Sequence, residues 1–184
     1  DFMIEQSFMR VDDVARELGV SKSYAMTGWR IGYTAGPTEV IKAMSSLQSQ
    51  VASGSNSIAQ YAAEEALRSP KGPEEIERMH KAYDERRRHI VSRLNAIDGL
   101  KCVMPKGAFY VMVDMSALIG RHLGDHEITG SMDFASMLLE NADVALTPGS
   151  AFCAEGFCRI SYATSMENID KGVDRIERFV KSLV

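Results

Sequence analysis

Several features that mark specialised protein classes are scarce in this sequence of 184 residues. It has three cysteines, Cys102, Cys153 and Cys158, and no two of them form a C-x-x-C pair, so a reducing compartment suits the chain better than a disulfide framework does. No apolar run approaches the length of a membrane-spanning helix, and residues 1–10 lack the basic-then-apolar pattern of a signal peptide. The chain has 21 Lys and Arg against 25 Asp and Glu. Proteins that bind nucleic acids or anionic membranes usually have an excess of basic residues, so this balance argues against both partners.

The remaining composition is that of a globular protein, with 45% hydrophobic and 25% charged residues. We therefore expect a soluble, cytoplasmic protein that binds neither nucleic acid nor a membrane. The chain begins with Asp1 rather than with Met, which is compatible with a fragment or with a processed product.

The spacing of apolar residues predicts an α/β protein whose best candidate boundary is the SPKGP segment at 69–73. Before this segment we expect a short helix over 11–18, a polar loop, a buried strand in WRIGYTAG (29–36), and helices that begin near Thr38 and Ser57. After it we expect a long helix opened by Pro73, followed by strands in LKCVM (100–104) and AFYVMVDM (108–115) and a loop over 119–131. A helix from Ser131 and strands in VALTP (144–148) and FCRISYA (157–163) come next. A terminal helix has a capping-box pattern at Thr164 to Glu167. The second part is thus predicted to be two long helices over a small sheet.

Lys22 and Arg30 are the first candidate functional residues. Lys22 follows Ser21 in a loop of small residues, and Arg30 lies eight residues further on, inside GWRIGY. An aldehyde cofactor needs an amine that loses its proton near neutral pH, which a partly buried site with nearby cations favours. The phosphate of such a cofactor is matched by a guanidinium and by the backbone N–H groups of small residues. The order S-K-x-x-x-M-x-G-W-R-x-G-Y is far more specific than any one of its members.

The segment SKSYAMTGWRIGY resembles the lysine segment of the class I aminotransferases, the fold-type I family that includes the aspartate aminotransferases. By this resemblance Lys22 holds pyridoxal 5′-phosphate (PLP) as a Schiff base and serves as the general acid and base. The resemblance also implies that Arg30 binds the cofactor's phosphate and that Ser21 lies beside that phosphate. The family's later landmarks follow in order, as PKGAFYVMVDMS and ALTPGSAFCAEGFCRISYATS, so the resemblance covers residues 20–184.

Arg159, within GFCRISYA, is similar to the family's arginine that binds the α-carboxylate of the substrate. A planar guanidinium grips a carboxylate with two parallel hydrogen bonds and so fixes its orientation. The reaction that the resemblance implies is transfer of an amino group between an α-amino acid and a 2-oxo acid by a homodimer. The identity of the amino acid stays open.

The resemblance further implies the C-terminal half of a PLP-transferase. Residues 1–70 would be the C-terminal part of the large, PLP-binding domain, and residues 71–184 a complete small domain with an α/β sandwich. The likeness ends before Lys22, where Leu18 stands in place of a usual asparagine and no aspartate is assigned as the partner of the pyridine nitrogen. Because that aspartate keeps the ring nitrogen protonated, we expect weak catalysis or none from this chain alone.

Two other interpretations stay open. PLP-dependent C–S lyases and carboxy-lyases of the same fold share the lysine and the carboxylate arginine, and a non-catalytic chain could keep the small domain and a dimer surface. His122 and His126 have a spacing that binds metals on helices, but the glycines around them disfavour a helix, so we expect no metal site. Phe109 and Tyr110 are expected in the core, with a lid at the substrate entrance as the alternative.

Overall fold

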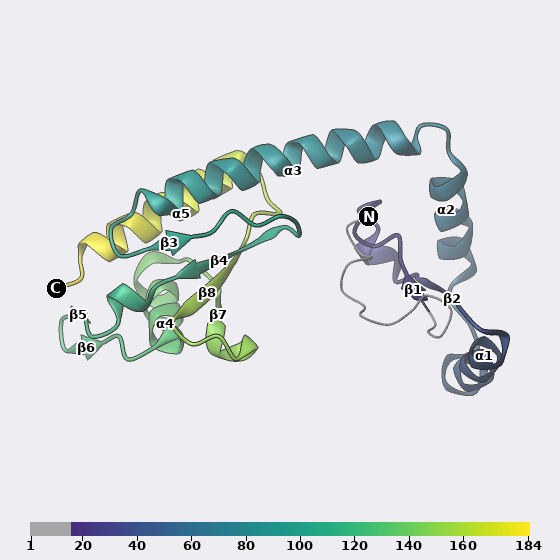
Figure 1. Ribbon diagram of the computed structural model, residues 1–184, viewed down its shortest axis with the longest axis horizontal. Helices are drawn as coiled ribbons and strands as arrows, with labels where there is room; N and C mark the ends of the chain where they lie inside the picture. The colour runs from purple at the N-terminus through teal and green to yellow at the C-terminus, as the bar shows by residue number, and fades with distance from the viewer. Residues whose placement is uncertain (1–15) are drawn as a thin grey trace. The chain divides into compact units, whose positions relative to one another are not determined.

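The structure, a computed structural model, describes residues 16–184, with side chains described from Gly19 onward (Figure 1). The chain divides into two compact units, and the division falls between Met79 and His80, inside the long helix α3 (Gly72–Asn95). The assignment of residues 1–70 and 71–184 to a large and a small domain stays a prediction.

The first unit combines a two-stranded ribbon with helices. Strand β1 (Arg16–Leu18) pairs antiparallel with β2 (Tyr33–Ala35), with Leu18 opposite Tyr33. The connection contains the 3-10 turn η1 (Thr27–Trp29). The helices α1 (Thr38–Ala52) and α2 (Ser57–Arg68) follow, which confirms the two helices predicted from the sequence.

Two expectations for this unit are wrong. The helix predicted over 11–18 is a strand at Arg16–Leu18, and residues 11–15 lie outside the described residues. Pairing with a segment further along the chain outweighs the weak helical preference of these residues. The buried strand predicted over 29–36 is confined to Tyr33–Ala35, and Tyr33 is 43% exposed, because little within the described unit covers a two-stranded ribbon.

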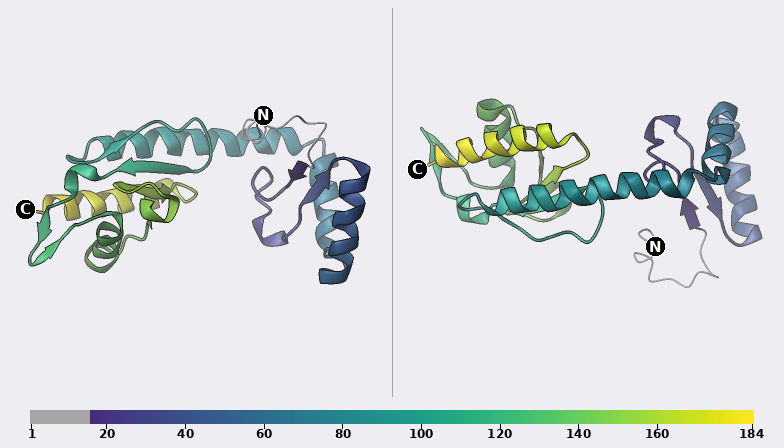
Figure 2. Two further views of the ribbon diagram at one scale, coloured as in Figure 1. Left: turned by 60° about the horizontal axis from the view of Figure 1, so that its bottom comes forward. Right: turned by 90° about the horizontal axis from the view of Figure 1, so that it is seen from above.

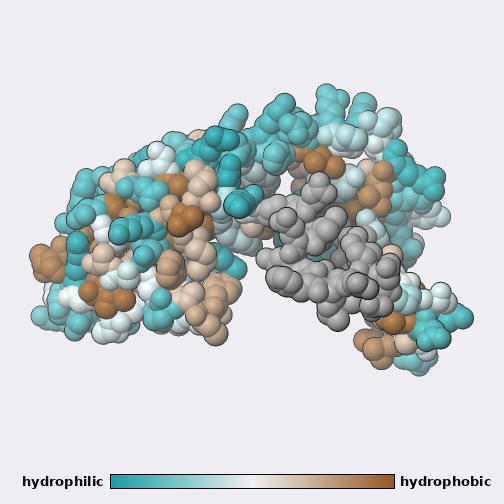
Figure 3. Space-filling view, viewed as in Figure 1, coloured by the Kyte–Doolittle hydropathy of each residue, from teal (hydrophilic) through white to brown (hydrophobic). Residues whose placement is uncertain are grey.

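The buried core of the first unit is small. Its cluster contains Val20, Met26 and Ala63, with a few partly buried neighbours. Among the described residues none of α1 is buried, and Leu47 and Val51 are 67% and 75% exposed. Figure 3 shows apolar residues at the surface in the region of α1. The apolar stripe of α1 is therefore unpartnered within residues 16–79.

The second unit is built on a four-stranded antiparallel sheet of order β3–β4–β8–β7. The strands are β3 (Lys101–Cys102), β4 (Tyr110–Asp114), β7 (Thr147–Pro148) and β8 (Phe157–Ser161), and two further helices are α4 (Ser131–Ala142) and α5 (Met166–Lys181). Each predicted strand and helix of this part is present, although all four strands are shorter than predicted.

Side chains alternate between the two faces of this sheet. Val111 and Val113 are at most 2% exposed and belong to the core, whereas Met112 and Phe157 are each 37% exposed. One face therefore packs against the helical layer, and the other face is open. Arg159 lies opposite Met112 in the register of β4 and β8, so Arg159 belongs to the open face.

The part of α3 from His80 onward and helix α5 run side by side over the sheet (Figures 1 and 2). Arg93 of α3 joins them, since its guanidinium contacts Asp170 Oδ1 at 2.6 Å and Asp174 Oδ1 at 2.5 Å. His89 Nε2 lies 2.6 Å from the same Asp170 oxygen. These contacts hold the register between two helices that are distant in the sequence.

The terminal helix α5 begins one residue later than its capping pattern suggested. Ser165, not Thr164, is the N-cap, and its hydroxyl accepts a hydrogen bond from the backbone N–H of Asn168 at 3.2 Å. The terminal segment buries one apolar face, whose members are Ile169, Val173, Ile176, Val180 and Leu183.

A small hairpin occupies part of the loop expected over 119–131. Its strands are β5 (His122–Leu123) and β6 (His126–Glu127), and Val184 exchanges two backbone hydrogen bonds with His122, at 2.9 and 3.0 Å.

Within residues 19–184 no cluster of three metal-ligating side chains is present. None of the helices in the described residues has the length and apolar character that crossing a bilayer requires.

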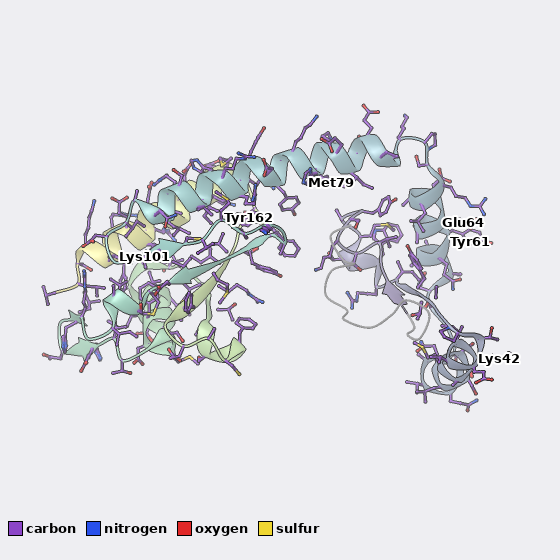
Figure 4. The ribbon with its side chains drawn as sticks, viewed as in Figure 1. Lys42, Tyr61, Glu64, Met79, Lys101 and Tyr162 are labelled. Atoms are coloured by element: carbon purple, nitrogen blue, oxygen red, sulfur yellow. The ribbon has the colours of Figure 1, made fainter. Side chains whose placement is uncertain are left out.

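The loop over 105–109 is hydrogen-bonded to α3 and to Tyr162, which follows strand β8. Arg87 Nη1 of α3 donates to the Pro105 carbonyl at 2.5 Å, and the Tyr162 hydroxyl donates to the Ala108 carbonyl at 2.6 Å. Tyr162 is 1% exposed, and its ring meets that of Tyr83 at a centroid distance of 6.3 Å, beneath α3 (Figure 4). The loop that leads into β4 is therefore fixed from the core side.

Replacing Asn95 with alanine is expected to lower the free energy of unfolding by about 2 kcal/mol. Asn95 Oδ1 accepts from the Cys102 N–H at 2.8 Å, and Asn95 Nδ2 donates to the Cys102 carbonyl at 2.9 Å. One side chain thus satisfies both backbone groups of a buried residue on the edge strand β3. Urea denaturation followed by circular dichroism measures the loss. The control is Asn141→Ala, which removes a single bond to the Met137 carbonyl, and equal losses in the two variants would contradict the prediction.

Candidate functional site

The loop that carries Ser21 and Lys22 is closed by the β1–β2 pair. Residues 19–32 connect the two strands, so the antiparallel pairing brings both ends of this loop together. Val20 and Met26 are buried at 1% and 7% exposure and anchor the loop to its unit. Between them the backbone turns, with hydrogen bonds from Tyr24 N to the Val20 carbonyl at 3.1 Å and from Ala25 N to the Lys22 carbonyl at 3.2 Å. The buried anchors leave the Lys22 side chain exposed and Ser21 half-buried.

Arg30 lies at the other end of the same loop. Its backbone has a left-handed conformation with φ of 52°, which follows directly on η1. The guanidinium donates one hydrogen bond, from Nη1 to the Thr27 carbonyl at 3.1 Å. An arginine has five N–H donors, so this bond orients the side chain while leaving donors for an anion.

The chemistry of the loop over 19–32 fits PLP. It supplies a primary amine for the aldehyde, a hydroxyl and a guanidinium for the phosphate, and a turn rich in small residues. All three predicted cofactor residues, Ser21, Lys22 and Arg30, belong to this one loop of the first unit. Arg159 belongs to the second unit.

Arg159 projects from the open face of the sheet between two neighbouring strands. In the register of β8 it lies opposite Met112 of β4 and Thr147 of β7. Its Cζ atom lies 4.4 Å from the ring centroid of Tyr110 and 4.4 Å from that of Phe152. A hollow of about 220 Å³ adjoins it, lined by Tyr110, Ala145, Leu146, Thr147, Arg159 and Ser161. This hollow offers one cation and several hydroxyl groups.

The guanidinium of Arg159 differs from those of several arginines of its unit that form ion pairs. Arg87, Arg93 and Arg175 each contact aspartates of the fold at 2.5 to 3.7 Å. Among residues 19–184 no carboxylate pairs with Arg159, whose described contacts are the two aromatic rings. An arginine held on rings, without an acidic partner, keeps its N–H donors for an external anion.

The expectation that Phe109 and Tyr110 are both core residues is wrong for Tyr110. Phe109 packs against the core, whereas the Tyr110 ring lies against the Arg159 guanidinium on the open face. The alternation of side chains along β4 could have predicted this position. Val111 and Val113 face the core, so Tyr110, which is next to Val111 in the strand, faces the opposite side. Phe152 was not considered from the sequence, and no local pattern indicates its contact with Arg159.

The turn that leads to Phe152 is held by Glu155 and Ser131. The turn η3 (Gly149–Phe152) donates a hydrogen bond near its start, from Ser150 N to Ser131 Oγ at 3.2 Å. Glu155 Oε1 accepts from Ser131 N at 2.6 Å and from Gly156 N at 3.2 Å. These bonds, of which the one from the Ser131 N–H is the largest contribution, hold the pKa of Glu155 below its usual value of 4.5.

The contribution of Glu155 to stability is expected to depend on pH. A carboxyl whose folded pKa is lowered stabilises the fold above its unfolded pKa, and this stabilisation is lost as the pH falls through the folded pKa. The variant Glu155→Gln should therefore melt at a lower temperature than the wild type at pH 7. That difference should shrink as the pH falls below about 4.5. Thermal unfolding between pH 3 and pH 7 measures it, and a difference that stays constant over this range would show that the Glu155 carboxylate does not stabilise the fold through these hydrogen bonds.

Two of the three cysteines are buried, Cys102 and Cys158, whereas Cys153 is exposed. All are free thiols, and burial raises the pKa of Cys102 to about 11 and that of Cys158 to about 12. Such thiols stay protonated at neutral pH and pack as small apolar groups.

Comparison with known proteins agrees with the chemistry of the loop over 19–32. The family model for aminotransferases of class I and II matches residues 6–176. The chain is 47% identical over 160 residues to an aspartate/prephenate aminotransferase of Nitrosomonas europaea, covering 86% of this chain and 40% of that protein. It is 46% identical over 159 residues to an aspartate aminotransferase of Rhizobium meliloti, covering 86% of this chain and 38% of that protein.

Solved structures show the same likeness. A crystal structure of the aspartate aminotransferase from Rhizobium meliloti matches with a TM-score of 0.88 at 43% identity, over 92% of this chain and 42% of that one. An aromatic aminotransferase from Pyrococcus horikoshii matches with a TM-score of 0.80 at 39% identity, over 90% of this chain and 42% of that one. The chain spans about two fifths of the length of the curated relatives that it matches. Because the family model matches nearly the whole chain and the fold agrees, this chain belongs to the class I and II aminotransferases.

Proposed function

We propose that this chain supplies the cofactor lysine and the substrate-carboxylate arginine of a PLP-dependent enzyme that transfers an amino group from an α-amino acid to a 2-oxo acid. The observation that carries the proposal is the closed loop over 19–32, which holds Ser21, Lys22 and Arg30 together in a chain of this family. The names of the relatives, aspartate and aspartate/prephenate aminotransferases, support aspartate as the amino donor.

Each residue has a distinct role in this proposal. When bound, PLP supplies an electron-withdrawing ring that stabilises negative charge at the substrate Cα. Lys22 Nζ attaches the cofactor and then moves the proton of the substrate Cα. Arg30 and Ser21 bind the phosphate with charge-assisted and neutral hydrogen bonds. Arg159 grips the α-carboxylate, which orients the Cα–H bond for proton removal.

The cofactor assignment is tested by trapping. The chain is incubated with PLP and reduced with borohydride, and the modified peptide is mapped by mass spectrometry. One adduct per chain, confined to the peptide that contains Lys22, supports the proposal. Labelling scattered over several lysines, or none, would favour the non-catalytic interpretation of the chain.

Product analysis separates amino transfer from the lyase alternatives. Aspartate with 2-oxoglutarate should yield oxaloacetate and glutamate, whereas a C–S lyase releases a thiol from cystathionine-like substrates and a carboxy-lyase releases carbon dioxide. Because the chain spans about two fifths of its relatives' length, we expect weak turnover by this chain alone. A thiol or carbon dioxide as the main product would replace the proposed reaction by a lyase reaction.

We also propose that the chain acts as a homodimer, as its resemblance to the family implies. Light scattering at micromolar concentration measures the mass directly. A monomer at those concentrations, with PLP present, would overturn this part of the proposal.

A further inference from the structure

Two aromatic rings lie against the Arg159 guanidinium. Its Cζ lies 4.4 Å from each of two ring centroids, and the rings come from different elements, Tyr110 from β4 and Phe152 from η3. A guanidinium over an aromatic face gains cation–π attraction while its N–H groups, which lie in its own plane, stay free. The rings thus restrain the side chain without consuming its hydrogen-bond donors.

The Tyr110 ring is supported from the core side, and Phe152 is carried by a hydrogen-bonded turn. The Tyr110 ring contacts that of Phe109 at 4.4 Å, and Phe109 in turn meets Tyr83 of α3 at 6.2 Å. Phe152 closes η3, where the Ala154 N–H donates to the Gly149 carbonyl at 2.9 Å. The aromatic contacts of Arg159 are therefore continuous with the packed interior on one side and with a hydrogen-bonded turn on the other.

We propose that Tyr110 and Phe152 are positioning residues that hold the Arg159 guanidinium ready for a carboxylate. This inference rests on the proposed function of Arg159. The physical reason is entropy, since an arginine that samples many rotamers must be immobilised when it binds an anion. Two ring faces restrict those rotamers before binding, so the carboxylate meets a guanidinium that is already in place.

The test uses the whole chain, labelled with ¹⁵N-arginine, and pyruvate as the carboxylate probe. The Nε–Hε resonance of Arg159, assigned by its loss in Arg159→Lys, reports both binding and side-chain mobility. Phe152→Leu and Tyr110→Leu keep apolar bulk but remove the ring faces. Phe152→Tyr and Tyr110→Phe keep a ring and serve as matched controls. Phe152 is 44% exposed, so its replacement should leave the fold intact, and a thermal melt of each variant verifies this.

Removal of either ring is expected to raise the dissociation constant for pyruvate by about 3- to 10-fold, the cost of immobilising one side chain. The same variants should speed rotation about the Arg159 Nε–Cζ bond and shift its Nε–Hε resonance. The ring-keeping controls should bind within about 2-fold of the wild type, because the aromatic face remains.

Two opposite results separate this inference from the function beneath it. If Arg159→Lys weakens pyruvate binding while both leucine variants bind as the wild type does, the carboxylate site stands and the positioning role is overturned. If Arg159→Lys leaves pyruvate binding unchanged, the carboxylate site itself is wrong. Equal weakening by the leucine variants and by their ring-keeping controls would also overturn the positioning role, because it would show a general packing effect.

Discussion

Replacing Gly149 with alanine is expected to lower the free energy of unfolding of the second unit by about 3 kcal/mol or more. A Cβ atom at this position would lie within 3.0 Å of the carbonyl oxygens of Ala154 and Phe157. These are backbone atoms, so no rotamer change relieves the overlap. The turn η3 would have to open, and with it the support of Phe152 beside Arg159.

Gly172→Ala is the matched control for this prediction. An alanine Cβ at Gly172 would meet nothing within 4 Å, and the residue lies inside α5. Alanine in a helix interior is favoured over glycine by about 0.5–1 kcal/mol, so this variant should be slightly more stable than the wild type. Urea denaturation of the wild type and both variants gives the comparison. A loss below about 1 kcal/mol for Gly149→Ala would show that the turn relaxes easily.

Replacing Lys22 with alanine is expected to abolish the site-specific PLP adduct, with at least about a tenfold loss of trapped cofactor at limiting PLP. The expectation follows from the closed loop over 19–32, in which Lys22 shares a short connection with Ser21 and Arg30, the proposed phosphate ligands. An amine whose aldehyde partner is also held through its phosphate gains from proximity, which a solitary surface lysine lacks.

Lys42→Ala is the control for that experiment. Lys42 lies on α1 in the same unit and is exposed, as Lys22 is (Figure 4). If accessibility alone governed labelling, both lysines would react and each variant would lose a similar amount. Retention of the adduct in Lys42→Ala and its loss in Lys22→Ala would single out the loop. Equal losses would mean that PLP labels exposed amines without a site.

The candidate residues could be predicted from the sequence, because the motif that identifies them is local. Ser21, Lys22 and Arg30 lie within ten residues of one another, and Arg159 follows a distinctive turn, so their order alone indicates the family. Their roles in chemistry stay predictions that the trapping and titration experiments test. The long helices were likewise predictable, because α3 and α5 show sustained helical periodicity and clear signals at their starts.

Other features depended on contacts between distant segments. Arg16–Leu18 looks helical by itself, and only its pairing with Tyr33–Ala35 makes it a strand. The contact between Phe152 and Arg159 likewise requires the turn and the strand to fold against each other.

By itself, then, the sequence determined the family, the helices and the identity of the residues that carry the proposed chemistry. Each of these depends on the order and spacing of residues that are close together in the chain. The tertiary structure alone decided that β1 exists, that one sheet face stays open, and that Tyr110 and Phe152 flank Arg159. The physical reason is that strand pairing and ring–cation contacts join segments that are separated along the chain. Their energies depend on distance in space, which no local pattern of residues contains.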